Sequence, residues 1–360
     1  MEKGKKRLTS KTTVPVWELV LTGSLLLLAA GLSLAAREID GFGQWYAVTI
    51  YPVFVAFWNH ILGWLPFSAV EMGLYLLLLG IVVLVIRKWR QPWKVAVHLL
   101  CIASVLCFLY VIHCGINYYR LPFSAYLDLE VRESSVQELE ELCQYLTEQV
   151  NETADSAGYR DNLSSYAVLG QQAMEQLGES YPQLAGDYPR PKPVAVSEIL
   201  SVQQLCGIYA PFTIEANYNR DMPAYNIPHT ICHELSHLKG FMREDEANFI
   251  GYLACIQSEA EHFRYSGYLM GWIYATNQLA RVDTDAYARM YAQLKQPVVE
   301  DLKENSRFWD RYEGKVAEAA NQLNDVYLKI NSQEDGVESY GRMVDLMLAY
   351  YRENPLYNHS

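Results

Sequence analysis

Three apolar runs in the first third of the chain constrain its fold more than any other feature. They cover residues 19–36, 67–86 and 95–116, and each is close to the roughly 20 residues that a helix needs to cross a bilayer. Backbone polar groups inside a bilayer must be paired within the protein, so each run is predicted to form one transmembrane helix. The first run could instead be a signal peptide, but it is long for one and charged residues follow it.

The basic residues predict how these helices are oriented. Five Lys and Arg residues precede the first run and four lie between the second and third, but only Arg37 lies between the first and second. The positive-inside rule therefore predicts a cytoplasmic N-terminus and an extracytoplasmic C-terminal domain in the cell membrane. The predicted segments are a cytoplasmic tail at 1–16, transmembrane helices at 17–36, 67–86 and 95–117, an outer loop at 37–66, a cytoplasmic loop at 87–94, and the extracytoplasmic domain at 118–360.

The outer loop is rich in aromatic residues between 45 and 65, where Pro52 and Pro66 also fall. This composition is typical of a helix that lies in the membrane interface rather than one that crosses it. Glu71 lies near the outer end of the second apolar run, where a structural role is at least as plausible as a functional one.

Charge and cysteine usage narrow the classes of partner and of fold. Residues 121–360 carry 18 Lys and Arg against 36 Asp and Glu, which argues against nucleic acid as a partner. The seven cysteines lack C-x-x-C spacing, so neither a disulfide framework nor a cysteine zinc cluster is indicated.

The pattern after residue 118 predicts a mainly α-helical fold, with a three-helix anchor followed by a mostly helical domain that has a small β-sheet. Ser135 and Glu138 form a capping box that opens a helix to about Val150. The stretch 181–194 holds four prolines and is predicted to be irregular. Further predicted helices cover 162–177, 269–279, 283–295, 298–330 and 337–352, and strict alternation predicts a strand at 212–219.

The candidate site lies in residues 229–248, where His233, Glu234 and His237 form an H-E-x-x-H motif. On a helix the two histidines share one face, so their imidazoles can hold Zn²⁺ while Glu234 takes a proton from a water molecule. The helix is predicted from Pro228 to Lys239, with Asn226 as its cap and a glycine after its end.

A catalytic zinc needs a third protein ligand. Residues 244–248 read E-x-x-A-N, which resembles the gluzincin metallopeptidases, whose third ligand is a Glu on a second helix. The resemblance implies Glu244 as the third ligand, with Glu246 as the alternative, and Asn248 as a residue that orients a ligand. His229 is expected in the pocket beside the ligands rather than on the metal.

A wider resemblance covers nearly the whole chain. Four stretches resemble a family of bacterial multi-pass membrane proteins of unknown function with a C-terminal zincin-like domain. The resemblance implies the architecture above and says little about the substrate. The stretches are 115–120, 233–248, 264–268 and 327–341.

These features together predict a membrane-anchored zinc metallopeptidase that cleaves a peptide or protein substrate outside the bilayer, with Glu234 as general base. The strand before the motif helix is expected to pair with the substrate backbone, although it is about equally plausible as a simple edge strand. The polar residues on that strand are Thr213, Glu215 and Asn217. The candidates for a donor to the transition state, chosen by residue type alone, are Tyr265, Arg264, His262 and Tyr340.

Two other functions fit the same residues. One is a non-catalytic, membrane-tethered module that binds peptide or cell-envelope material in a zincin-like groove. The other is a structural zinc site closed by a fourth protein ligand, for which Glu246 or His229 is the candidate.

Overall fold

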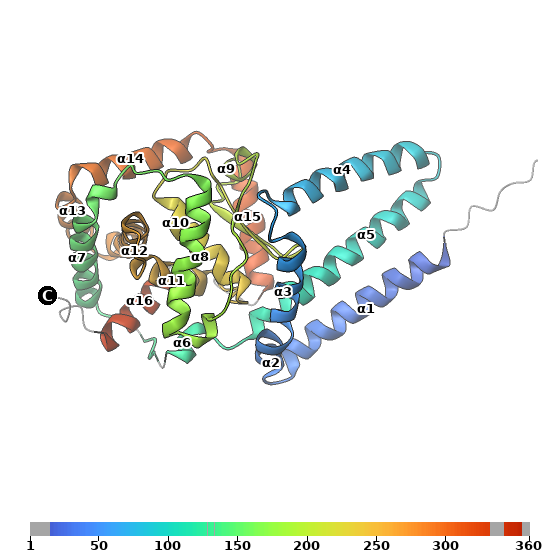
Figure 1. Ribbon diagram of the computed structural model, residues 1–360, viewed down its shortest axis with the longest axis horizontal. Coiled ribbons are helices and arrows are strands. Elements are labelled where there is room, and N and C mark those ends of the chain that lie inside the picture. The colour runs from blue at the N-terminus through green and yellow to red at the C-terminus, as the bar shows by residue number, and fades with distance from the viewer. Residues whose placement is uncertain (1–14, 128, 133, 332–341, 355–360) are drawn as a thin grey trace, which may run out of the picture.

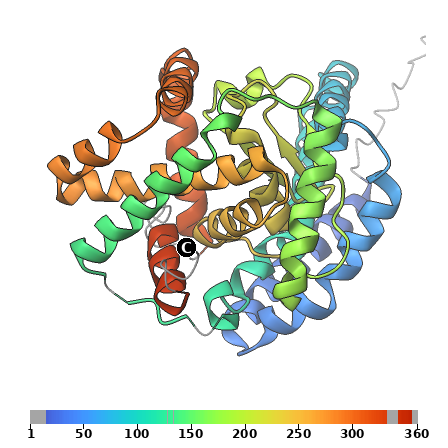
Figure 2. The same cartoon turned by 60° about the vertical axis from the view of Figure 1, so that its left-hand side comes forward.

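The computed structural model describes residues 15–127, 129–132, 134–331 and 342–354, and it is mostly helical. Three long apolar helices extend from one side of a helical domain (Figure 1), and they remain on one side when the molecule is turned (Figure 2). The predicted fold class, with its three apolar helices and a small sheet, is confirmed.

The three apolar helices, which we call the anchor, are α1 (Val16–Glu38), α4 (Ala69–Lys88) and α5 (Pro92–His113). Each is long and apolar enough to cross a membrane, and the third candidate span continues through the 3₁₀ helix η1 (Gly115–Tyr119). Helix α1 packs along α5. The predicted segments match these helices to within a few residues, and the structure thus indicates membrane association.

Two short helices lie where the anchor meets the domain (Figure 1). These are α2 (Phe42–Thr49) and α3 (Tyr51–Leu62), in place of the single helix predicted for residues 45–65. Pro52 lies in the first turn of α3, where a missing N–H breaks no helical hydrogen bond. The aromatic side chains of Trp45, Phe57 and Trp64 are exposed.

Most helices of the domain begin within two residues of the predicted start. The helix predicted at 269–279 instead covers Glu261–Val282, and the start predicted at 337 lies outside the described residues. Ser135 and Glu138 form the predicted capping box, and Asn162 caps the next helix. The predicted helix at 298–330 is interrupted at Gly314, whose φ of +145° suits glycine. The remaining α-helices are α6 (Phe123–Tyr126), α7 (Val136–Glu152), α8 (Leu163–Ser180), α9 (Glu198–Ser201), α10 (Asn226–Leu238), α11 (Glu244–Ile256), α12 (Glu261–Val282), α13 (Thr284–Ala292), α14 (Gln296–Asp310), α15 (Lys315–Ile330) and α16 (Arg342–Glu353).

The sheet has three short strands, β1 (Lys192–Pro193), β2 (Gly207–Ala210) and β3 (Glu215–Tyr218), in the order β1-β3-β2. β3 is parallel to β1 and antiparallel to β2. The predicted strand at 212–219 was therefore too long, because residues 211–214 form the turn between β2 and β3. The stretch predicted to be irregular contributes β1.

The expected role of the predicted strand in substrate binding was wrong. β3 is the central strand of the described sheet, with β2 paired along its whole length and β1 paired with Asn217 and Tyr218, so it is not an edge strand to which a substrate could add. Thr213 lies in the turn, and Asn217 is fully buried. Glu215 is also buried and binds Lys192 and the start of α4.

Candidate metal site

Helix α10 carries the H-E-x-x-H motif and lies in the middle of the domain, packed against α8, α11, α12, β2 and β3. Asn226 is the first residue of the helix rather than its cap. Its side chain donates a hydrogen bond to Asn305. The helix ends at Leu238, and Gly240 follows with φ +84°. This left-handed residue turns the chain as predicted.

Helix α11 returns directly against α10 after that turn. The two backbones touch at Gly251, where an added Cβ would lie 3.1 Å from the His233 N atom and 3.2 Å from the His229 O atom. Such close contact favours glycine, since a larger residue would push the two backbones apart by a few tenths of an ångström. It brings Glu244, the first residue of α11, over the two histidines.

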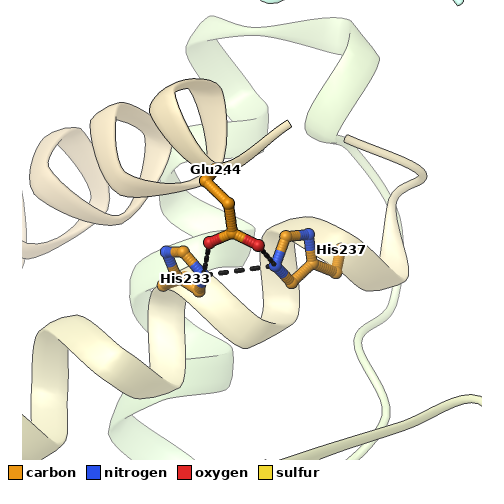
Figure 3. Close-up of side chains that lie close together, drawn as sticks. All are labelled: His233, His237 and Glu244. Carbon is orange, nitrogen blue, oxygen red and sulfur yellow. Dashed lines mark hydrogen bonds and ion pairs between the residues drawn. The ribbon is translucent and has the colours of Figure 1, made fainter. Parts of the chain in front are cut away.

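The side chains of His233, His237 and Glu244 converge on one point (Figure 3). The two Nε2 atoms are 3.2 Å apart, and Glu244 oxygens lie 3.3 Å from His233 Nε2 and 3.8 Å from His237 Nε2. Ligand atoms around a tetrahedral zinc, with bonds of about 2.0–2.2 Å, lie roughly 3.3 Å from one another. The three donors therefore have the spacing that a bound metal ion requires.

The other nitrogen of each imidazole is already occupied. His233 Nδ1 lies 2.8 Å from Asn248 Oδ1, and His237 Nδ1 lies 2.7 Å from the carbonyl oxygen of Phe241. Each oxygen can accept a hydrogen bond from an Nδ1–H, so that in the neutral form of each ring Nε2 carries no proton and is the atom that can bind a metal. Asn248 thus lies where the resemblance implied a residue that orients a ligand.

Glu234 lies beside the converging donors and is only 4% exposed. Its Oε2 atom has no hydrogen-bond partner in the part of the chain that the structure describes. Burial raises the pKa of Glu234 to about 8, with a smaller opposing effect from His233. A bound divalent cation would lower this pKa again, so the carboxyl group is suited to exchange a proton near neutral pH.

The pKa values of the three ligand candidates are shifted by burial and by the charges that they place on one another. Burial lowers the pKa of His237 to about 4 and keeps it neutral. Burial alone would raise the pKa of Glu244, but the hydrogen bond and charge of His233 outweigh it and lower the pKa. Burial alone would lower the pKa of His233, but the hydrogen bond and charge of Glu244 outweigh it and raise that pKa.

Glu246 and His229 do not join this cluster. Glu246 accepts a hydrogen bond from the Phe123 N–H at 3.1 Å and lies 3.5 Å from Arg243. Burial raises the pKa of Glu246 to about 7. His229 is held by the backbone oxygen of Asn248 at 3.1 Å. Of the two glutamates considered, the structure brings only Glu244 to the histidines, and among the described residues no fourth His, Cys, Asp or Glu closes the group.

Three of the four donors predicted from residue type lie elsewhere. Tyr265 donates a hydrogen bond to Asp301, and Arg264 donates to the carbonyl oxygens of Ser258 and Glu259. His262 packs against Tyr159 and Tyr166 and lies 3.8 Å from Asp161. All three residues lie near the start of α12, where their side chains contact the partners just named instead of the metal-site residues. Tyr340 lies outside the described residues.

The structure adds neighbours that the sequence did not indicate. At Gly207 an added Cβ would lie 2.5 Å from Glu234 Oε1, so β2 begins against the carboxylate. The ring of Tyr209 is 5.9 Å from that of His237. Burial raises the pKa of Tyr274 of α12, and the nearby charges of Cys206 and Glu244 raise it further. With 27 tyrosines in the chain, no sequence signal distinguishes these two.

Comparison with known proteins gives one match. A family model described as "Protein of unknown function (DUF3810)" matches residues 46–348, which include α10, α11 and two of the three apolar helices. Searches of curated proteins and of solved structures found no match. Because the match covers most of its length, the chain belongs to the DUF3810 family of proteins of unknown function.

Proposed function

We propose that this chain is a membrane-anchored zinc metallopeptidase. The observation that carries the proposal is the convergence of His233, His237 and Glu244 beside Glu234, whose buried Oε2 has no partner among the described residues. A structural role for Glu234 would leave that oxygen hydrogen-bonded, because an unsatisfied buried carboxylate is costly.

The donor set fits zinc at a catalytic site. Two imidazoles and one carboxylate are a known catalytic set, whereas structural zinc sites are usually closed by four protein ligands. When bound, zinc would polarise the peptide carbonyl and lower the pKa of a water molecule. The hydrogen bonds from His233 to Asn248 and from His237 to the Phe241 carbonyl would hold both rings in the metal-binding tautomer.

Glu234 would act as the general base and then as the general acid. It would accept a proton from the attacking water and donate one to the nitrogen of the leaving amine. Tyr274 is the candidate donor to the oxyanion, because it is close enough to Glu244 for that charge to affect its pKa. The hydroxyl of Tyr209 is committed instead to the carbonyl oxygen of His113.

Strand β2 would take the role first expected of residues 212–219. It is the edge strand of the described sheet beside Glu234, and an edge strand can pair with an extended peptide through main-chain hydrogen bonds. The distribution of basic residues favours a cytoplasmic N-terminus, with this domain and its substrate on the outer side.

Replacement of Glu234 by Gln in the full chain tests the proposal. Purified in detergent, the variant is expected to keep one zinc per chain by mass spectrometry. Its hydrolysis of a random peptide library should fall by roughly 10²–10⁴-fold, the usual contribution of general acid–base catalysis. The matched control is Glu246→Gln, which removes an equally buried carboxylate outside the site and should retain both properties.

Two results would contradict the proposal. Undiminished hydrolysis by the Glu234→Gln variant would exclude this carboxylate as the base. Zinc binding by the wild-type chain with no hydrolysis of any library peptide would favour the non-catalytic binding module.

A further inference from the structure

The metal site is hydrogen-bonded to the helix that lies at the end of the anchor. Tyr51, the first residue of α3, donates a hydrogen bond to the carbonyl oxygen of His237 at 3.2 Å. Further along, α3 and the loop after it expose Phe57 (55%) and Trp64 (76%). Exposed aromatic side chains beside apolar spans are typical of the membrane–water interface, which puts the backbone of a candidate metal ligand next to that interface.

Strand β2 connects the site to the end of α5. Its first residue, Gly207, contacts Glu234. Two residues further on, the Tyr209 hydroxyl donates to the carbonyl oxygen of His113, the last residue of α5, at 2.9 Å. His113 Nδ1 in turn lies 2.6 Å from the carbonyl oxygen of Pro211. The strand thus runs from the general base candidate directly to the end of an apolar helix.

Reciprocal carboxylate contacts join the same sheet to the start of α4. Glu215 of β3 accepts hydrogen bonds from the N–H groups of Ala69 and Val70 at 3.1 and 2.8 Å. Glu71 of α4 accepts hydrogen bonds from the N–H groups of Ala195 and Val196 at 2.7 and 2.9 Å. A carboxylate at a helix N-terminus satisfies free N–H groups and favours the helix dipole. These contacts of two buried carboxylates fix the sheet and the segment after β1 against the start of α4.

The distance from the site to the bilayer is therefore short. Gly207 and Tyr209 are two residues apart on a strand, or roughly 7 Å. The polar headgroup layer on each side of a bilayer is roughly 5–8 Å thick. With α5 spanning the bilayer and ending at its surface, the site would lie at the level of the headgroups or just beyond them, within a few extended residues of the hydrocarbon.

We propose that the substrate of this site is the membrane-adjacent segment of another polypeptide that carries its own transmembrane helix. This inference rests on the proposed peptidase function. A peptide that pairs with β2 and follows it toward α5 reaches the hydrocarbon within about five residues, at 3.3 Å per residue. A substrate already held in the bilayer presents that stretch beside β2, whereas a soluble peptide must enter the headgroup layer to reach the same edge.

The test uses the full chain in vesicles of phosphatidylcholine and phosphatidylglycerol. The probe is a single-span polypeptide in the same vesicles, with a randomised 30-residue segment outside the span. The same randomised segment without a span is the soluble control. Cleavage positions and rates are read by mass spectrometry for the wild type and for Glu234→Gln. We expect Glu234-dependent cuts in about the first ten residues outside the span, at a rate at least tenfold above that of the soluble control.

Two other outcomes overturn the inference, and they differ in what they leave standing. Glu234-dependent cuts spread evenly along the segment, or equally fast in the soluble control, would exclude a membrane-adjacent substrate but keep the peptidase. Absence of Glu234-dependent cuts in either probe, with zinc bound to the wild-type chain, would overturn both proposals.

Discussion

Two clusters in this domain contain similar residues but differ in arrangement. At the candidate metal site, nitrogen and oxygen atoms of His233, His237 and Glu244 converge on one point. The second cluster lies around the start of α12, where His262 is 3.8 Å from Asp161 and Asp301 of α14 accepts hydrogen bonds from both the Tyr265 hydroxyl and the Gly158 N–H. Residue type alone therefore does not identify a metal site. In the first cluster the possible metal-binding atoms of three side chains lie close to one another and point toward the same position.

The largest difference between the two clusters should appear when one histidine is removed from each. His237→Ala should weaken zinc binding by more than a hundredfold, because the roughly 10–16 kcal/mol of a zinc site is shared here among three protein ligands. His262→Ala should change zinc affinity by less than twofold. Both dissociation constants can be measured by competition with a chelator. Equal losses in the two variants would show that the clusters do not differ in this way.

A smaller loss is expected when the hydrogen bond behind His233 is removed. Asn248→Ala should weaken zinc binding about 10–100-fold, the usual effect of losing a group that orients a metal-bound histidine. Asn248→Asp keeps an oxygen acceptor for Nδ1–H and should restore most of the affinity. The same chelator competition measures both variants, and an Asp variant as weak as the Ala variant would argue against an orienting role.

In the second cluster, loss of a hydroxyl should affect stability alone. Tyr265→Phe leaves Asp301 without one of its hydrogen bonds and should lower the free energy of unfolding by about 1–3 kcal/mol. Chemical denaturation of the full chain measures this change, and the zinc content should stay at the wild-type level. A loss of zinc in this variant would mean that the two clusters are coupled.

The smallest expected effect is a dependence of stability on pH. Burial raises the pKa of Asp301, an effect that the hydrogen bonds from Tyr265 and Gly158 only partly offset. Because the folded pKa is above the unfolded one, the carboxyl group's contribution is full at low pH and is lost as the pH rises through the folded pKa. Asp301→Asn should remove this decline. Parallel denaturation curves for both proteins from pH 4 to pH 7 would contradict it.

The part of the site that follows from local spacing could be predicted from the sequence. Residues four apart on a helix share a face, so His233 and His237 had to be neighbours. Gly240 marked the turn between the helices, and the apolar runs marked the anchor. The choice between Glu244 and Glu246 depends on which side of the second helix faces the histidines. The resemblance to gluzincins implied Glu244, whereas the spacing alone left both residues open.

The rest depends on contacts between distant segments, for which the sequence holds no signal. β3 became a central strand because Lys192 and Pro193, in a proline-rich stretch, pair with it. Tyr51 reaches His237 across 186 positions. Selecting transition-state donors by residue type failed for Tyr265 because the first turn of α12 contacts Asp301 and not the site.

The most direct test of the metal site compares two glutamates on one helix. Zinc per chain is measured by mass spectrometry in the full-length wild type, in Glu244→Gln and in Glu246→Gln, purified side by side. We expect about one zinc in the wild type and in Glu246→Gln, and almost none in Glu244→Gln, because of the two glutamates only Glu244 lies with the histidines. Zinc retained by Glu244→Gln, or a folded wild-type chain that binds no zinc, would contradict it.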